Sequence, residues 1–223
     1  MTASQRKNHL KNDLYRYFIK CLNAKYLHTK EGGSYATERN GNTLYIFFEH
    51  SNGRADWISN IDFRIKRGAK EKGSFLYHNG FLLVWNSILP YIKNQIFDKS
   101  ARKIVIVGYS HGGAIAGLCY EYVKNNRKDI EALEGYGYGA PRFKWGKRDS
   151  LHIWQGHYVI RNKNDIVTYL PPRLFGFVHV GEIINIGERS RYSPIDAHRK
   201  ESYIKSLEEY KKPLQTTEAF RFN

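Results

Sequence analysis

Residues 105–117 read VIVGYSHGGAIAG, and this stretch demands one particular local geometry. The β-branched run before Gly108 is typical of a buried strand, and the small residues after Gly112 continue into a helical segment. Between them lies a Gly-x-Ser-x-Gly pentapeptide centred on Ser110. The two glycines remove Cβ atoms where strand and helix crowd together. The stretch therefore predicts a sharp strand-to-helix turn that presents the Ser110 hydroxyl at its apex.

Segments of strand and helix type alternate through the rest of the chain. A length of 223 residues suits one domain with its own core. The pattern predicts a single α/β domain over residues 1–223, with a central, mostly parallel sheet flanked by helices. Helices are expected at 5–27, 81–96 (with Pro90 inside), 114–125 and 197–210, and strands at 43–49, 103–107, 135–139, 156–161 and 178–186.

The charge balance is strongly basic. Lys and Arg number 36 against 21 Asp and Glu, a formal net charge of +15. Such a surface attracts anions, including the headgroups of an anionic membrane, although it can equally serve solubility alone. The basic residues are scattered, and no basic motif with interleaved aromatic residues occurs. No specific nucleic-acid partner is therefore expected.

Compartment is indicated by the cysteines and by the N-terminal residues. Cys21 and Cys119 lie in apolar, helix-like contexts and do not form a disulfide framework, which favours a reducing compartment. No apolar run of signal-peptide length follows the basic N-terminal residues, and no apolar stretch reaches 18 residues. These observations predict a cytoplasmic protein, with non-standard export left open.

A nucleophilic serine needs a base and an orienting acid. Asp165 follows the strand expected at 156–161, and catalytic groups of α/β sheets gather at the carboxyl ends of strands; the alternative is a turn-capping aspartate. If the chain order is Ser, Asp, His, the base is His179 or His198. His179 lies in an apolar strand-like run, whereas His198 lies at a loop-to-helix boundary, so His198 is favoured. No histidine spacing indicates a metal site, and no cofactor is expected.

Four separated blocks, spread over residues 43–203, carry a family resemblance. They read FEHSNGRADWISNIDF, YHNGF, GYSHGGAIA with the later YGYGAPR, and RNKNDIVTYLPP with FGFVHVGE. Together they resemble the class 3 lipases, the fungal triacylglycerol lipase type of the α/β-hydrolase fold. The resemblance implies hydrolysis of carboxylic esters, most readily lipid acyl esters, by a triad of Ser110, Asp165 and His198. It also makes His179 a non-catalytic residue.

The oxyanion hole is implied at two positions. The elbow points the backbone N–H of His111 at the place where an oxyanion forms. The resemblance adds the N–H of Ser51, with His50 in the position where the family usually has glycine.

A lid is implied after Ser51. A narrow apolar face there comprises Trp57, Ile58 and Ile61, and basic residues follow at 64–72. This segment is either a lid that docks on an anionic membrane or a solvated loop over an esterase site. Two other functions stay open: a phospholipase acting on anionic membrane lipids, and a catalytically silent protein that binds an anionic partner.

Overall fold

The computed structural model describes residues 3–30, 32–49, 65–67, 76–146, 153–189 and 191–212. The helices within these ranges are α1 (Ala3–Asn23), α3 (Asn79–Phe97), α4 (His111–Asn126) and α5 (Lys200–Lys211), with short 3-10 turns η1 (Ile166–Tyr169), η2 (Arg173–Phe175) and η3 (Asp196–His198). The strands are β1 (Leu27–His28), β2 (Ser34–Asn40), β3 (Thr43–Phe48), β4 (Ile65–Arg67), β5 (Leu76–His78), β6 (Lys103–Tyr109), β7 (Ala132–Tyr138), β8 (Lys144–Trp145), β9 (His157–Asn162), β10 (Phe177–Val178) and β11 (Glu182–Ile186).

The main sheet has seven strands in the order β1-β2-β3-β6-β7-β9-β11 within the described residues. Strands β3, β6, β7, β9 and β11 pair in parallel, while β1 and β2 add an antiparallel edge. The central strand β6 is buried along nearly its whole length, which explains its continuous β-branched run. Because the parallel strands share one direction, the residues that follow β6, β7 and β9 meet at one edge of the sheet.

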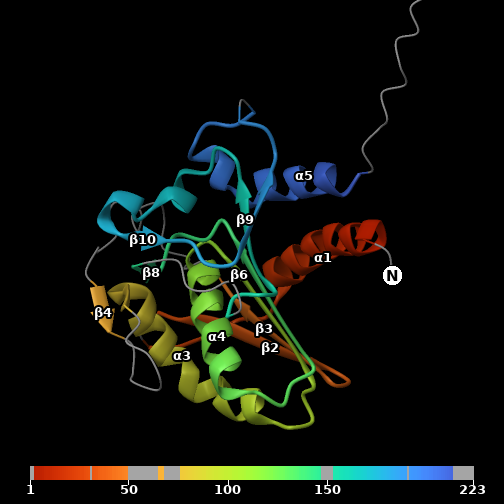
Figure 1. The fold of residues 1–223 in the computed structure, drawn as a ribbon, viewed down its shortest axis with the longest axis vertical. Helices are drawn as coiled ribbons and strands as arrows, with labels where there is room; N and C mark the ends of the chain where they lie inside the picture. The colour runs from red at the N-terminus through yellow and green to blue at the C-terminus, as the bar shows by residue number, and fades with distance from the viewer. Residues whose placement is uncertain are drawn as a thin grey trace, which may run out of the picture.

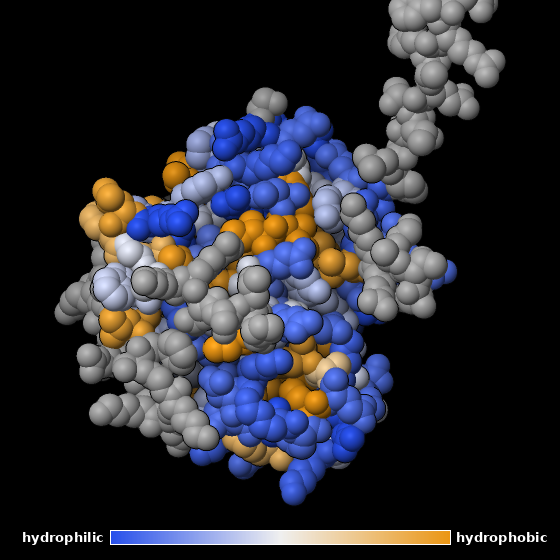
Figure 2. All heavy atoms as spheres, in the orientation of Figure 1, coloured by the Kyte–Doolittle hydropathy of each residue, from blue (hydrophilic) through white to orange (hydrophobic). Residues whose placement is uncertain are grey.

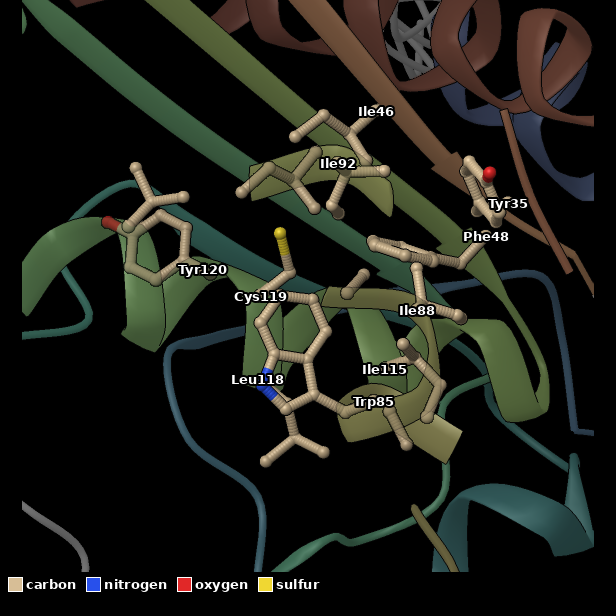
Figure 3. Packing of buried hydrophobic residues seen from close by; sticks show 14 of the residues in the cluster. Tyr35, Ile46, Phe48, Trp85, Ile88, Ile92, Ile115, Leu118, Cys119 and Tyr120 are labelled. Atoms are coloured by element: carbon tan, nitrogen blue, oxygen red, sulfur yellow. The ribbon is translucent and has the colours of Figure 1, made fainter. Parts of the chain in front are cut away.

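Helices cover both faces of the main sheet (Figure 1). Helices α3 and α4 pack on one face, where Trp85, Ile88 and Ile115 meet side chains of β2 and β3 (Figure 3). Helices α1 and α5 pack on the other face, over a second core that includes Phe18 and Tyr203. Burial of these apolar surfaces supplies the main driving force for folding.

A smaller antiparallel sheet, ordered β10-β8-β5-β4, lies beside α3 and α4. A buried ion pair ties it to α4: the Lys144 ammonium of β8 lies 3.0 Å from the Glu121 carboxylate. The Tyr77 hydroxyl of β5 donates to the other Glu121 oxygen at 3.0 Å. Paired and hydrogen-bonded in this way, two buried charges are tolerated in the interior.

Several expectations differ from the structure. The helix expected at 5–27 ends at Asn23, and Leu27 lies in strand β1. The single strand expected at 178–186 is wrong: β10 belongs to the small sheet and β11 to the main one, and Gly181, with a φ of 88°, turns the chain between them. Helix α4 begins at His111, three residues earlier than expected, because the elbow passes directly into the helix. The last helix is divided into η3 and α5, with extended backbone at Arg199. No helix in the described part of the chain is long and apolar enough to cross a membrane.

Candidate active site

Ser110 stands at the turn between β6 and α4 in a strained backbone conformation. Its φ of 57° and ψ of −123° make it the one non-glycine residue with positive φ among the described residues. Such conformations cost energy and persist only where the surroundings impose them. Here the Ser110 N–H donates to the Tyr138 carbonyl of β7 at 2.8 Å, and the Ser110 carbonyl accepts from the N–H of Gly113 at 2.9 Å. The backbone N–H and the backbone carbonyl of Ser110 are therefore both held by hydrogen bonds.

Two glycines make this turn possible because no side chain would fit at either position. A Cβ on Gly108 would lie 2.0 Å from the Gly112 carbonyl oxygen. A Cβ on Gly112 would lie 2.3 Å from the carbonyl oxygen of Phe48, at the end of β3. The first turn of α4 is thus pressed against the ends of two strands, which directs the Ser110 side chain away from the sheet.

Asp165 lies three residues beyond β9, at the same edge of the sheet as Ser110. Its side chain is fully buried. One carboxylate oxygen, Oδ1, accepts the backbone N–H of Val167 at 2.9 Å, which starts η1. The other, Oδ2, accepts from His198 Nδ1 at 2.8 Å and from the Tyr203 hydroxyl at 2.6 Å. Three donors therefore compensate the loss of water around this buried carboxylate.

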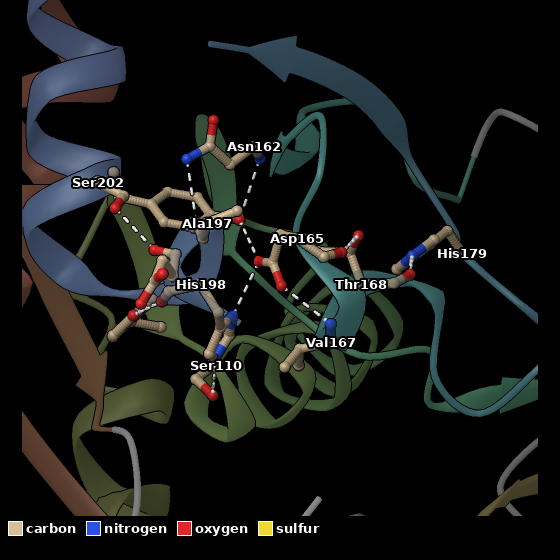
Figure 4. A network of polar contacts seen from close by, with 12 residues as sticks. Ser110, Asn162, Asp165, Val167, Thr168, His179, Ala197, His198 and Ser202 are labelled. Carbon is tan, nitrogen blue, oxygen red and sulfur yellow. Dashed lines mark hydrogen bonds and ion pairs between the residues drawn. The ribbon is translucent and has the colours of Figure 1, made fainter. Parts of the chain in front are cut away.

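His198 lies between Asp165 and Ser110 (Figure 4). Its Nδ1 faces the Asp165 carboxylate, which can only accept, so the ring carries its proton there. Its Nε2 lies 2.8 Å from Ser110 Oγ and accepts a hydrogen bond from the hydroxyl group. The imidazole is stacked on the Tyr109 ring, with centroids 5.5 Å apart. The three residues form one continuous chain of hydrogen bonds from hydroxyl to carboxylate.

The η3 turn that carries His198 is held at three successive carbonyl oxygens. The carbonyl of Asp196 accepts from the Ser202 hydroxyl at 2.7 Å, and that of Ala197 from the Asn162 amide at 3.0 Å. The carbonyl of His198 accepts from the Tyr109 hydroxyl. These donors come from α5, β9 and β6, so the sheet and the closing helix together set the position of the imidazole.

The two tyrosines of this network remain neutral donors. Burial, with the nearby Asp165 carboxylate, raises the pKa of Tyr203 well above its ordinary value. Burial also raises the pKa of Tyr109, again with a contribution from Asp165. A tyrosine that cannot ionise near a carboxylate keeps its proton available for donation. Tyr203 uses it on Asp165 while accepting the backbone N–H of Asn162 at 3.1 Å.

The other histidines named from the sequence lie elsewhere. His179 is buried, and its Nε2 lies 2.6 Å from the Thr168 carbonyl of η1. His111 is the first residue of α4, and its ring meets Phe81 edge-on at 5.1 Å. Ser51, His50 and the lid residues Trp57, Ile58 and Ile61 lie outside the described residues. Within the described ranges, no group of three or more His, Cys, Asp or Glu could hold a metal ion.

Sequence reasoning assigned no role to Tyr203, Asn162 or Tyr109. The one available signal was the position of Tyr203, five residues after His198 at the start of a helical segment. Nothing in the spacing shows that its hydroxyl crosses to a residue 38 positions earlier. Such contacts depend on how α5 packs on the sheet.

Solved structures of fungal lipases share this architecture. A Rhizomucor miehei triacylglyceride lipase superposes with a TM-score of 0.63 at 22% identity, over 85% of this chain and 83% of that one. Lipase II from Rhizopus niveus superposes with a TM-score of 0.60 at 22% identity, over 74% and 66% of the two chains. The predicted fold class is confirmed: the chain has the α/β-hydrolase fold, with a mostly parallel central sheet flanked by helices.

Curated relatives match in sequence as well. A lipase of Rhizomucor miehei is 30% identical over 148 residues, which cover 63% of this chain and 40% of that protein. Secreted mono- and diacylglycerol lipase 1 of Fusarium solani is 31% identical over 159 residues, 68% of this chain and 46% of that protein. The chain thus spans less than half the length of these relatives.

The expectation of a cytoplasmic protein is wrong. The Fusarium relative and further relatives from Malassezia restricta and Malassezia globosa are all named secreted lipases. Two cysteines were a weak basis for choosing a compartment, since both are free and buried in this fold, where they act as small apolar residues.

A family model provides the remaining comparison. The model described as Lipase (class 3) matches residues 45–175, more than half of the chain. The matched range runs from β3 through the Ser110 elbow and Asp165 to the η2 turn. The predicted resemblance is confirmed, and the chain belongs to the class 3 lipase family.

Proposed function

We propose that the chain is a serine hydrolase that cleaves carboxylic esters of lipids. One observation carries the proposal: a strained elbow presents Ser110 to His198, which is bonded in turn to the buried carboxylate of Asp165. Nucleophile, base and orienting group in one hydrogen-bonded chain are the arrangement that acyl transfer requires. The relatives are named lipases and mono- and diacylglycerol lipases, which supports a lipid acyl ester as the substrate. We also propose that residues 1–223 form one domain.

The reaction follows from the hydrogen bonds. His198 Nε2 takes the proton of Ser110 as Oγ forms a bond to the acyl carbon. The tetrahedral intermediate then loses the alcohol, which leaves with the proton from Nε2. Water attacks the acyl-enzyme, His198 takes its proton, and Ser110 recovers a proton as the carboxylic acid departs. Asp165 holds Nδ1–H throughout and stabilises the imidazolium ion.

We assign the oxyanion hole to two backbone N–H groups. His111 follows Ser110 at the start of α4, where the partial positive charge of the helix N-terminus favours an anion. Ser51 is proposed for the second donor from its place in the family pattern. Loss of one such donor typically lowers kcat by about 10²–10³. Trp57, Ile58 and Ile61 remain the proposed lid.

A finer proposal concerns the physical form of the substrate. The net charge of +15 favours a lipid aggregate that contains anionic lipids. Because three of the relatives are named secreted lipases, we propose that this lipid is extracellular. The first discriminating measurement is hydrolysis of neutral acylglycerols against anionic phospholipids.

Active-site labelling tests the proposal. A fluorophosphonate probe should label the unmutated chain and should fail to label Ser110→Ala. On a panel of soluble esters, His198→Ala should lose activity, whereas His179→Gln should retain it because its ring bonds a carbonyl of η1 instead. Circular dichroism checks that each variant is folded. Activity in His198→Ala with none in His179→Gln would overturn the assignment of the base. Absence of labelling, together with tight binding of a polyanion, would favour a silent binding protein.

A further inference from the structure

The η2 turn exposes two large apolar side chains side by side. Leu174 is 91% exposed, more than any other large hydrophobic residue in the described part of the chain, and its neighbour Phe175 is 55% exposed. Trp145 of β8 is 37% exposed and donates its Nε1–H to the Phe175 carbonyl at 2.8 Å. Scattered exposed hydrophobic residues are ordinary on a protein surface, but a contiguous group indicates a surface for interaction.

This apolar tip, which we define as Trp145, Leu174 and Phe175, is rigidly mounted. Gly176 has a φ of 84°, and a Cβ there would lie 2.5 Å from Trp145 Nε1. The Gly146 N–H donates to the Gly176 carbonyl at 2.9 Å, and β10 pairs with β8 directly beyond. Figure 2 shows hydrophobic surface along the edge of the molecule where Figure 1 labels β10, β8 and β4. The exposed side chains therefore do not belong to a loosely held loop.

Positive charge accompanies the apolar tip. Arg173 is exposed in the same turn, and the guanidinium groups of Arg142 and Arg161 lie 5.9 and 5.0 Å from the Tyr169 ring, next to η2. Arg142 also donates to the carbonyls of Tyr169 and Pro171. Burial, together with the like charges of Arg161 and Arg173, lowers the pKa of Arg142. None of these three arginines takes part in an ion pair within the described residues, so no neighbouring carboxylate neutralises their charge, and Arg173 presents it at the surface.

The apolar tip adjoins the catalytic edge of the sheet. Asp165 caps η1, and η1 leads through two prolines into η2. A backbone hydrogen bond also joins the segment after β7 to the end of η1, since the Arg142 N–H donates to the Leu170 carbonyl at 2.7 Å. A lipid surface in contact with η2 would therefore lie on the side of the molecule where Ser110 is presented.

We propose that the η2 turn is a membrane anchor, with Leu174 and Phe175 entering a bilayer that contains anionic lipids and Arg173 remaining at the level of the phosphates. The proposal rests on the proposed function, because it names the surface on which that function operates. Apolar insertion and electrostatic attraction are the two contributions that hold a protein at an interface. Tryptophan favours the boundary between headgroups and acyl chains, which suits Trp145. The three arginines select an anionic bilayer over a zwitterionic one.

Flotation with vesicles tests the anchor directly. The full chain with Ser110→Ala is used so that the lipid stays intact, and the vesicles are phosphatidylcholine with or without phosphatidylglycerol. Added to this background, Leu174→Ser should weaken binding about tenfold or more, since it removes one inserted leucine. Arg173→Gln should weaken binding about fivefold on the anionic vesicles, and high salt should abolish that difference. Leu27→Ser is the matched control, because Leu27 is 60% exposed in β1, which forms the edge of the main sheet opposite β11.

The outcomes separate the anchor from the enzyme. In the chain with Ser110 intact, Leu174→Ser should hydrolyse a soluble short-chain ester at the unmutated rate and lose activity on anionic vesicles. Equal binding losses for Leu174→Ser and Leu27→Ser would overturn the anchor, as would equal binding to both vesicle types. Self-association lost in Leu174→Ser, with vesicle binding unchanged, would assign the apolar tip to a second copy of the chain instead. If no ester is hydrolysed, the proposed function fails while the flotation result still decides the anchor.

Discussion

Burial of His157 should make the fold sensitive to mild acid. His157 begins β9, the strand that leads to Asp165, and its side chain is buried against the rings of Tyr120 and Trp154, with centroids 5.1 and 5.3 Å away. Its Nδ1 lies 3.2 Å from the Val180 carbonyl, while its Nε2 has no hydrogen-bond partner among the described residues. A second proton on this ring would be buried without an acceptor. Burial accordingly lowers the pKa of His157 from 6.5 to about 4.

The effect on stability follows from the difference between the pKa of His157 in the unfolded chain and in the folded chain. The unfolded chain takes up a proton on His157 near pH 6.5, whereas the folded chain resists it until about pH 4. The stabilisation is therefore fully present above pH 6.5 and is lost as the pH falls toward 4. At 1.36 kcal/mol for each pKa unit, the free energy of unfolding falls by about 3 kcal/mol in full. Most of this decrease has occurred by pH 4.5.

Urea unfolding at pH 7.5 and pH 4.5 measures this loss. His157→Gln keeps an N–H that can reach Val180 but cannot take up a proton, so its free energy of unfolding should fall by about 2.5 kcal/mol less over this range than that of the unmutated chain. The exposed residue His28 supplies the matched control His28→Gln, which should keep the full loss. If His157→Gln loses as much stability as the unmutated chain, the acid sensitivity has another source.

Three further substitutions test contacts in the candidate site and elsewhere in the fold. Tyr203→Phe removes a hydrogen bond to the buried Asp165 carboxylate, and should lower the free energy of unfolding by about 1.5–3 kcal/mol in urea titrations and kcat roughly tenfold in steady-state assays. Gly108→Ala places a Cβ 2.0 Å from a backbone oxygen of α4, and should cost about 3 kcal/mol or more by thermal unfolding. Lys144→Met removes the buried cation that faces the Glu121 carboxylate and should cost about 3–5 kcal/mol in urea, most of which the added change Glu121→Leu should restore.

Matched substitutions distinguish these effects from general damage. Tyr91→Phe removes a hydroxyl from a tyrosine that is 58% exposed, and should change neither stability nor kcat. Arg102→Met breaks the exposed ion pair with Glu131 and should cost less than about 1 kcal/mol. If kcat is unchanged in Tyr203→Phe, Tyr203 does not position Asp165. If Gly108→Ala unfolds at the same midpoint temperature as the unmutated chain, the elbow tolerates a side chain.

Much of the architecture could be read from local patterns. The β-branched run of β6, the glycines around Ser110 and the amphipathic spacing of α1 and α3 each report a burial pattern that neighbouring residues share. The strands β4, β5 and β8 could not be found in this way, because each has two or three residues and is defined by its partners. The same holds for the division of residues 178–186, where pairing with two different sheets overrides one continuous apolar run.

In the candidate site too, some features could be read from local sequence patterns and others depend on the tertiary structure. Chain order and motif context selected Ser110, Asp165 and His198 without coordinates, because the turn after a buried strand and the polar residue at a strand end are local features. The choice of His198 over His179 rested on a loop-to-helix boundary, and the structure places His198 between the other two residues.

Only the tertiary structure decided what holds these groups in place. The three carbonyls of η3 are bonded from α5, β9 and β6, and the Tyr203 hydroxyl reaches Asp165 from a helix on the far face of the sheet. Each of these bonds joins residues that are distant in the chain or separated by a turn. Their existence depends on how the helices pack on the sheet, and packing is a property of the whole chain. The amino-acid sequence named the candidate reacting groups, and the packing set the distances between them.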